Sequence, residues 1–410
     1  AAPPLAVVGY DARRGSAAFA ADTAAVLTAA GVQTVLLPDP LPTPVLAFAV
    51  RHLSADAGVM VTASHNPPAD NGYKVYLGGR MTDEAGRGAQ IVSPADVAIA
   101  ELIDHEAWTA DIPLAEDGWT VAGDELLEAY REAALAVLDE DRHPDRALRI
   151  VYTPLHGVGG AVLPGLLDEA GFGPVHVVPE QAEPDPAFPT VAFPNPEEPG
   201  AMDLALALAA EVDADLVIAN DPDADRLALA APFPGPDGTR VWRMLSGDAV
   251  GTLLGAHLLP ARAAAERSVA NSVVSSPQLA ALAEAQSVAH HVTLTGFKWI
   301  SRAPQLGFGY EEALGYCVDP DMVRDKDGIT AALMAAELAA ALKAQGRGLT
   351  DALADVDAVT GAMPSAQVSV RVADLSLIAG LTDDVGRDLA LLGHAVYDRL
   401  AALEIPTVAD

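Results

Sequence analysis

The sequence predicts an α/β protein of three successive domains, each built on a mixed, mostly parallel sheet flanked by helices. Short runs rich in β-branched residues alternate with alanine- and leucine-rich runs of helical length, which is typical of β-α-β units. The alternation recurs in three blocks, at about 1–140, 141–245 and 246–360. Of the 410 residues, 51% are hydrophobic and 20% charged, so the chain can bury several cores.

The elements follow one another in a regular order. In the first block we expect a strand at 6–9, a helix at 17–30 that Gly31 can end, and then a strand at 33–37, a helix at 44–53 and a strand at 58–62. Further strands are expected at 148–152, 175–178 and 215–219 in the second block and at 269–274 in the third. Because active sites in such folds lie at the carboxyl ends of the strands, the residues that follow each strand are the ones to inspect.

The composition limits the classes of partner that the chain can bind. The net charge of −33 argues against a general nucleic-acid binder, which needs a basic face, and no apolar run predicts a membrane span. The single cysteine, Cys317, excludes an internal disulfide and fits a cytoplasmic protein. Three of the four lysines, Lys74, Lys298 and Lys326, fall in unusual loop segments, and Lys343 lies outside them. This placement is expected if a few cations are concentrated at a site for an anion; chance placement in a chain that prefers arginine is the alternative.

A serine-containing loop follows the strand expected at 58–62. Residues 63–74 have the sequence ASHNPPADNGYK, in which two prolines end regular structure and an Asn-Gly pair favours a turn. Ser64 can therefore act as a covalent carrier if something activates its hydroxyl or its bound group. Side chains of neighbours on extended backbone point apart, so we do not expect a hydrolase dyad with His65. A purely structural loop is the alternative.

The motif Thr-Ala-Ser-His-Asn-Pro, followed by Asn-Gly-Tyr-Lys, resembles the signature of the phosphohexomutases, the phosphoglucomutase and phosphomannomutase family. The resemblance implies that Ser64 carries the phosphoryl group and that Lys74 is an active-site lysine. It also places Arg13, which follows the first strand, near the phosphoserine. The likeness is greatest to the long-chain branch that resembles phosphomannomutases and phosphopentomutases.

Three aspartates stand at alternate positions after the strand expected at 215–219: Asp221, Asp223 and Asp225. Their carboxylates can converge on a cation if the loop curls, and hard oxygen ligands suit Mg²⁺ or Ca²⁺. An EF-hand is disfavoured, because arginine and proline stand where its loop needs glycine and glutamate. An aspartyl nucleophile of the haloacid-dehalogenase type is an alternative. A solvated acidic loop is less favoured, because three close carboxylates repel one another.

The segment Asp-Pro-Asp-Ala-Asp-Arg is similar to the metal loop of the same family. The resemblance assigns the three aspartates to Mg²⁺, with Ser64 completing the metal shell through a phosphate oxygen. It gives Arg226 the task of stabilising the transferring phosphoryl group.

Two segments of the third block, TGFKWI at 295–300 and GYEEALGY at 309–316, resemble the sugar-binding loops of the family. Carboxylates suit sugar hydroxyls because they make charge-assisted hydrogen bonds, although a glutamate at a helix N-terminus and a lysine lying along a tryptophan are the plain structural alternatives. The resemblance implies substrate contacts, with alanine in place of the family's serine at 313. The segment RDKDG at 324–328 also fits the family, where it lies near the substrate or metal. The implied contact residues are Lys298, Glu311, Glu312 and Gly315 of the two loops and Lys326 of this segment.

Residues 361–410 differ from the three blocks. We expect one strand at 367–372 and one amphipathic helix at 389–403, too little for a fourth domain. The resemblance covers about residues 5–375, and the Ser-Gly-Thr of the family's phosphate clamp occurs nowhere in the chain. We therefore expect a C-terminal remnant, a missing N-terminal segment and a longer natural protein.

The resulting hypothesis is an Mg²⁺-dependent phosphohexomutase that interconverts hexose 1-phosphate and hexose 6-phosphate of glucose, mannose or both. The reaction would pass through a phosphoserine and a bisphosphorylated sugar. A phosphopentomutase or a sugar-bisphosphate synthase of the same family is the first alternative, and a non-catalytic sugar-phosphate-binding protein is the second. The expected partners are small-molecule sugar phosphates; the sequence leaves the preferred sugar and the oligomeric state open.

Overall fold

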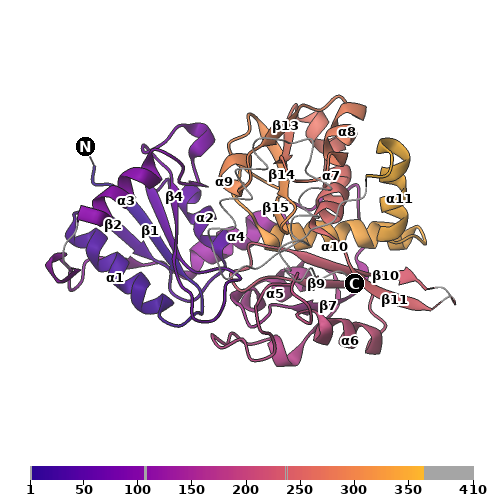
Figure 1. The fold of residues 1–410 in the computed structure, drawn as a ribbon, viewed down its shortest axis with the longest axis horizontal. Helices are drawn as coiled ribbons and strands as arrows, with labels where there is room; N and C mark the ends of the chain where they lie inside the picture. The colour runs from indigo at the N-terminus through magenta and orange to yellow at the C-terminus, as the bar shows by residue number, and fades with distance from the viewer. Residues whose placement is uncertain (1, 106–108, 236, 238, 364–410) are drawn as a thin grey trace, which may run out of the picture. The chain divides into compact units, whose positions relative to one another are not determined.

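Three sheets follow one another along the chain in the computed structural model, which describes residues 2–105, 109–235, 237 and 239–363 (Figure 1). Each sheet has a parallel centre and an antiparallel edge, and helices pack against it, which confirms the predicted fold class. The strand expected at 367–372 and the helix expected at 389–403 lie outside the described residues.

The first sheet has six strands in the order β5-β4-β3-β1-β2-β6. Helix α2 packs closely on it, because Gly58 in β3 has no side chain: a Cβ there would lie 2.4 Å from Val50 of α2. The elements are β1 (Leu5–Tyr10), α1 (Ser16–Ala29), β2 (Gln33–Leu36), α2 (Thr43–His52), β3 (Ala57–Val61), β4 (Tyr73–Leu77), β5 (Ala89–Gln90), α3 (Ala95–His105), β6 (Thr120–Val121) and α4 (Asp124–Leu135).

The second sheet has five strands in the order β11-β10-β9-β7-β8, and the third has four in the order β13-β12-β14-β15. The second comprises β7 (Ala147–Thr153), α5 (Leu163–Glu169), β8 (Gly173–Val177), α6 (Asp203–Glu211), β9 (Leu216–Ala219), β10 (Ala228–Pro234) and β11 (Arg240–Met244). The third comprises α7 (Gly247–Ala264), β12 (Ser268–Ser272), α8 (Gln278–Ala285), β13 (His290–Thr293), α9 (Phe297–Ile300), β14 (Leu306–Glu311), β15 (Gly315–Cys317), α10 (Gly328–Ala344) and α11 (Leu349–Thr360). None of the helices described here has the length and apolar character needed to cross a bilayer.

The carboxyl ends of one strand from each sheet meet. The loop after β9 contacts the first sheet's domain, where the N–H of Thr43 donates to the carbonyl of Asp223 at 2.9 Å. The same loop contacts the third sheet through a bridge between Arg226 and Gly315. The hydroxyl of Ser64, after β3, donates to Asp221, and Arg226 donates to the carbonyl of Ala313, after β14. The loops after β3, β9 and β14 are therefore neighbours although they are far apart in the sequence.

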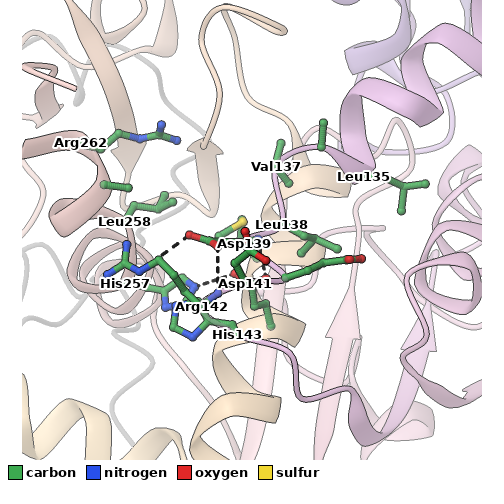
Figure 2. Close-up of a pocket in the computed structure, with 15 residues that line it drawn as sticks. Leu135, Val137, Leu138, Asp139, Asp141, Arg142, His143, His257, Leu258 and Arg262 are labelled. Atoms are coloured by element: carbon green, nitrogen blue, oxygen red, sulfur yellow. Dashed lines mark hydrogen bonds and ion pairs between the residues drawn. The ribbon is translucent and has the colours of Figure 1, made fainter. Parts of the chain in front are cut away.

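The connection between α4 and β7 also makes contacts outside its own domain. It lies against α7 and α10, where the backbone N–H of Asp139 donates to Glu337 of α10 at 2.9 Å. A cavity of about 580 Å³ opens at this contact and is lined by residues of the connection and of both helices (Figure 2).

Asp327 caps the N-terminus of α10, the buried helix that supports this arrangement. Its side chain accepts hydrogen bonds from the N–H groups of Ile329 at 2.9 Å and Thr330 at 3.0 Å, and from the hydroxyl of Tyr130 at 3.1 Å. Burial raises the pKa of Asp327 to about 6, and these hydrogen bonds only partly offset that effect.

The raised pKa predicts a pH dependence of stability. Between about pH 6 and pH 4 the folded chain holds a proton on Asp327 that the unfolded chain lacks, so this group makes the free energy of unfolding rise as the pH falls through that window. Asp327→Asn keeps the cap and removes this contribution, which is at most about 3 kcal/mol. We expect the difference in unfolding free energy between the two proteins to change in the wild type's favour from pH 7 to pH 4.5.

Denaturant unfolding at several pH values measures this difference. Asp203→Asn, at the exposed start of α6, is the matched control and should run parallel to the wild type. Parallel curves for Asp327→Asn and the wild type would contradict the prediction.

Candidate active site

The loop between β9 and β10 gathers the three aspartates. Asn220 holds both of its ends, accepting from the hydroxyl of Tyr152 at 2.9 Å and donating to the carbonyl of Arg226 at 2.7 Å. Ala224 has a φ of +56°, so the chain curls back within a few residues. One carboxylate oxygen each of Asp221, Asp223 and Asp225 then lies within 4.8 Å of the other two, and all three residues are fully buried.

The carboxylates fit a bound cation. Oδ1 of Asp223 and Oδ1 of Asp225 are buried without a hydrogen-bond partner. A buried polar atom without a partner is costly, and a metal ligand bond removes that cost. A set of three carboxylates is the hard oxygen donor set that Mg²⁺ prefers. These three residues would hold the ion.

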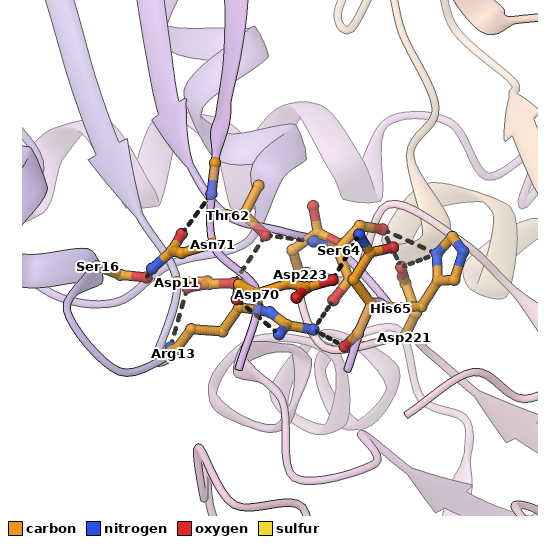
Figure 3. A network of polar contacts seen from close by, with 12 residues as sticks. Asp11, Arg13, Ser16, Thr62, Ser64, His65, Asp70, Asn71, Asp221 and Asp223 are labelled. Atoms are coloured by element: carbon orange, nitrogen blue, oxygen red, sulfur yellow. Dashed lines mark hydrogen bonds and ion pairs between the residues drawn. The ribbon is translucent and has the colours of Figure 1, made fainter. Parts of the chain in front are cut away.

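Ser64 lies against this loop. Its backbone N–H donates to the hydroxyl of Thr62 at 2.8 Å, and its own hydroxyl donates to Oδ2 of Asp221 at 2.7 Å (Figure 3). The serine loop of the first domain and the aspartate loop of the second are thus joined at the atom that would carry a phosphoryl group.

The expectation that His65 points away from Ser64 was wrong. Ser64 is in the left-handed region with a φ of +49°, so the backbone is not extended there. As a result Ser64 Oγ lies 3.2 Å from Nδ1 of His65, and that nitrogen lies 3.9 Å from Asp221. His65 therefore adds a polar contact to the serine.

Arg13 organises the serine loop from inside. Its guanidinium donates to backbone carbonyls of the loop and lies over the ring of Phe188 at 5.0 Å. The accepting carbonyls are those of Ser64 at 2.6 Å, Asn66 at 2.6 Å, Pro67 at 2.9 Å and Asp70 at 3.2 Å. Because these contacts use the guanidinium, they favour a positioning role for Arg13.

Asp11 connects this arginine to the sheet. It accepts from the hydroxyls of Ser16 at 2.6 Å and Thr62 at 2.7 Å, and Arg13 Nε lies 3.5 Å away (Figure 3). Burial raises the pKa of Asp11, and the hydroxyl donors oppose that shift. The ends of β1 and β3 are therefore tied together beneath the serine.

Lys74 supplies one cation to the aspartates. Its Nζ donates to Oδ2 of Asp223 at 2.6 Å and to Oδ2 of Asp225 at 2.5 Å. Burial by itself lowers the pKa of Lys74, but the two carboxylates outweigh burial and raise it above its ordinary value. In this state Lys74 is a cation and not a base.

Lys326 and Arg226 supply two more cations. Lys326 Nζ lies 3.3 Å from Asp225 and 3.7 Å from Glu311, and Arg226 Nε lies 3.9 Å from both Asp221 and Asp225. Burial raises the pKa of Asp225, as does neighbouring Asp223, yet the three cations hold it below its ordinary value. The three cations therefore favour the ionised form of Asp225.

The sugar-loop residues divide into two groups. Glu311 and Gly315 lie beside Lys326 and hence beside the aspartates; a Cβ on Gly315 would lie 2.4 Å from the stem of Lys326. Glu312 instead accepts from the hydroxyls of Ser272 at 2.8 Å and Ser275 at 2.9 Å. Lys298 lies at α9, with its Nζ 5.9 Å from the ring centre of Trp299, and is not among the cations paired with the aspartates in the part of the chain described.

Several site residues were not anticipated from the sequence. Thr43, at the start of α2, donates its hydroxyl to Oδ2 of Asp223 at 2.5 Å, and the only local signal is a proline on each side. Ala313 accepts from Arg226 at 2.5 Å through its carbonyl, which a sequence motif does not reveal. Burial raises the pKa of Glu197, although Arg226 and His65 act against the shift.

Comparison with known proteins identifies the family of the chain. Three family models match, each described as "Phosphoglucomutase/phosphomannomutase, alpha/beta/alpha domain", for domain I at residues 2–108, domain II at 128–232 and domain III at 246–358. The fold and these three matches, which lie in chain order across all three sheets, define an enzyme of the phosphosugar mutase class.

The chain is 50% identical over 382 residues to a probable phosphomannomutase of Haemophilus influenzae, covering 92% of this chain and 76% of that protein. It is 37% identical to the human phosphopentomutase, covering 85% of this chain but only 60% of that protein. A crystal structure of a putative phosphomannomutase from Thermus thermophilus matches with a TM-score of 0.72 and 30% identity over 91% of this chain and 80% of that one. The chain therefore belongs to the phosphoglucomutase and phosphomannomutase family, whose members are isomerases.

The contacts of Arg13 generate a prediction. Lysine keeps the charge but cannot reach several carbonyls in a planar arrangement, so Arg13→Lys should loosen residues 64–70 and misplace Ser64. We expect kcat/KM for mutase turnover to fall about 10- to 100-fold, in line with the cost of a misplacement of about 1 Å. Hydrogen exchange should increase in the serine loop while the aspartate loop stays protected.

The control is Arg80→Lys, which alters a half-exposed arginine paired with Asp56 in the same domain. It should leave both measurements close to the wild type. An unchanged kcat/KM in Arg13→Lys would exclude the positioning role.

Proposed function

We propose that this protein is a phosphohexomutase that interconverts hexose 1-phosphate and hexose 6-phosphate of glucose, mannose or both. The observation that carries the proposal is the 2.7 Å contact between the Ser64 hydroxyl and Asp221, one of three convergent carboxylates. A serine in this place can carry a phosphoryl group beside a metal ion. Glu311 of one sugar loop lies next to Lys326, which in turn pairs with Asp225.

In the proposed first step the phosphoryl group moves from Ser64 to the free hydroxyl of the sugar. The bond between phosphorus and Ser64 Oγ breaks, a bond to the sugar oxygen forms, and the hydroxyl proton goes to a base. A Mg²⁺ ion held by Asp221, Asp223 and Asp225 would neutralise the phosphoserine and the transferring group. After the bisphosphate turns over, the second step returns the other phosphoryl group to Ser64.

The charged residues of the site suit charge stabilisation, proton transfer and sugar binding. Lys74 and Arg226 are cations beside the carboxylates and would stabilise the negative charge of the transferring phosphoryl. Because Lys74 is protonated, it suits proton donation to Ser64 Oγ as the phosphoryl group leaves. Glu311 and Glu312 would bind sugar hydroxyls. Lys326, which lies beside Glu311, and Lys298 of α9 would be the cations that contact the substrate.

A phosphopentomutase is the second candidate. The human relative bears that name, and in this chain alanine stands at 313 within the sugar loop, where its carbonyl binds Arg226. The chemistry at Ser64 would be unchanged, so turnover measured with glucose 1-phosphate, mannose 1-phosphate and ribose 1-phosphate distinguishes the two.

The serine role predicts phosphorylation at one residue. Incubation with glucose 1,6-bisphosphate should add one phosphate to the protein, and peptide mass spectrometry should place it on Ser64. Ser64→Ala should abolish both the phosphate and turnover, while Ser54→Ala, which changes an exposed serine just after α2, should retain both. A phosphate on Asp221, or full turnover in Ser64→Ala, would exclude the serine carrier.

The aspartate role predicts a metal effect. Asp223→Asn removes one of three carboxylate ligands, so we expect Mg²⁺ to bind at least about tenfold more weakly, because even outer-shell changes cost about 10- to 100-fold in metal affinity. Titration calorimetry measures the binding, and a circular dichroism melt checks that the chain stays folded. Asp70→Asn on the serine loop is the control. Full turnover in excess chelator would contradict the assignment.

A further inference from the structure

A second group of metal-ligand side chains lies outside the candidate active site. It consists of His143 in the connection between α4 and β7, His257 in α7 and Glu337 in α10, and one ligand atom of each lies within 4.8 Å of the others. The group borders the cavity of about 580 Å³ beneath that connection (Figure 2). None of these residues was singled out in the sequence.

The geometry is convergent. Glu337 is fully buried, and its Oε1 lies 3.1 Å from Nε2 of His257. Its Oε2 accepts the N–H of Asp139 at 2.9 Å, which holds the connection to the helix. The rings of His143 and His257 lie side by side with centres 4.6 Å apart (Figure 2). Two imidazoles therefore flank one carboxylate at the edge of a space open to water.

The surrounding charges are nearly balanced. Acidic groups around the cavity are Asp139, Glu140, Asp141 and Glu337, and basic groups are Arg142 and Arg262. Arg146 lies 3.7 Å from Glu337 Oε2, and its terminal nitrogen NH2 has no hydrogen-bond partner. Because Arg146 competes for the carboxylate, we expect weaker binding than at a structural zinc site made of thiolates.

We propose that His143, His257 and Glu337 form a binding site for a divalent transition-metal ion of the zinc class. Two imidazole nitrogens and a carboxylate suit Zn²⁺, whereas Mg²⁺ prefers oxygen ligands. We therefore expect Zn²⁺ to bind at this site and Mg²⁺ at the three aspartates. Oε1 of Glu337 and Nε2 of His257 are already close enough to share one zinc ion, and the half-buried His143 would have to rotate toward them to complete the site. Water from the cavity fills the fourth position.

The site has a structural consequence. Its three ligands come from the connection that enters the second domain and from two helices packed with the third sheet's domain. A bound ion would therefore fix residues 136–146 to α7 and α10. The proposal is independent of the proposed function, since none of these ligands takes part in the chemistry at Ser64.

The test uses the full chain without a histidine tag, saturated with Mg²⁺ and titrated with Zn²⁺ in a calorimeter. We expect a single zinc ion to bind, and His143→Asn to weaken it on the order of 100-fold, because loss of a ligand costs at least as much as loss of an outer-shell partner. His105→Asn, at the exposed end of α3, is the matched control and should bind like the wild type. Asp223→Asn should also retain the zinc ion.

Two further measurements distinguish loss of the zinc site from loss of folding. Melting without metal should be the same for His143→Asn and the wild type, because the Glu337 contacts to His257 and Asp139 remain. Zinc should slow hydrogen exchange at 136–146 in the wild type only. Equal zinc affinity in His143→Asn, or zinc protection at 220–226 instead, would overturn the proposal.

Discussion

The structure depends on the burial of three carboxylates in one loop. Asp221, Asp223 and Asp225 would repel one another in a site removed from water, so cations have to compensate them. The loop provides only Arg226; Lys74 comes from the first domain and Lys326 from beyond the third sheet. The charges are balanced only when all three domains bring their strand ends together. The charge compensation of the loop and the packing of the three domains therefore depend on each other.

The serine loop satisfies a second requirement, that a reactive hydroxyl stay in one place. Ser64 has a φ of +49°, a conformation that costs about 1–3 kcal/mol in non-glycine residues. Arg13 offsets that cost by binding several carbonyls of the loop, including that of Ser64 itself. The strained backbone turns the hydroxyl toward Asp221 and His65 instead of into the sheet. Rigidity is built from backbone contacts, which leaves the side chain free for chemistry.

Much of this could be predicted from the sequence, because strand alternation and the position of Ser64 and the aspartates after strands are local properties. Contacts between side chains of different domains could not be predicted. Thr43 meets Asp223 across 180 residues, and neither residue type requires the other. Lys298 and Lys326 both stand in motif segments, yet only Lys326 is paired with an aspartate in the described structure. The prediction of the His65 orientation was wrong for another reason. Ser64 adopts a left-handed backbone conformation, and a serine, unlike a glycine or an asparagine, does not indicate that conformation in a sequence.

The hydrogen bonds of Lys74 bear on how an ammonium group and a metal ion can share the same aspartates. Each carboxylate has two oxygens, and Lys74 takes Oδ2 of Asp223 and Oδ2 of Asp225. The Oδ1 atoms of the same residues are buried without a hydrogen-bond partner. Lys74 therefore need not leave when a cation binds, because the two use different oxygens. Carboxylates shared in this way hold the ammonium at a fixed place beside the metal site. The charge that raises the pKa of Lys74 is the charge a bound metal would partly neutralise, so metal binding would lower that pKa and make its proton easier to donate.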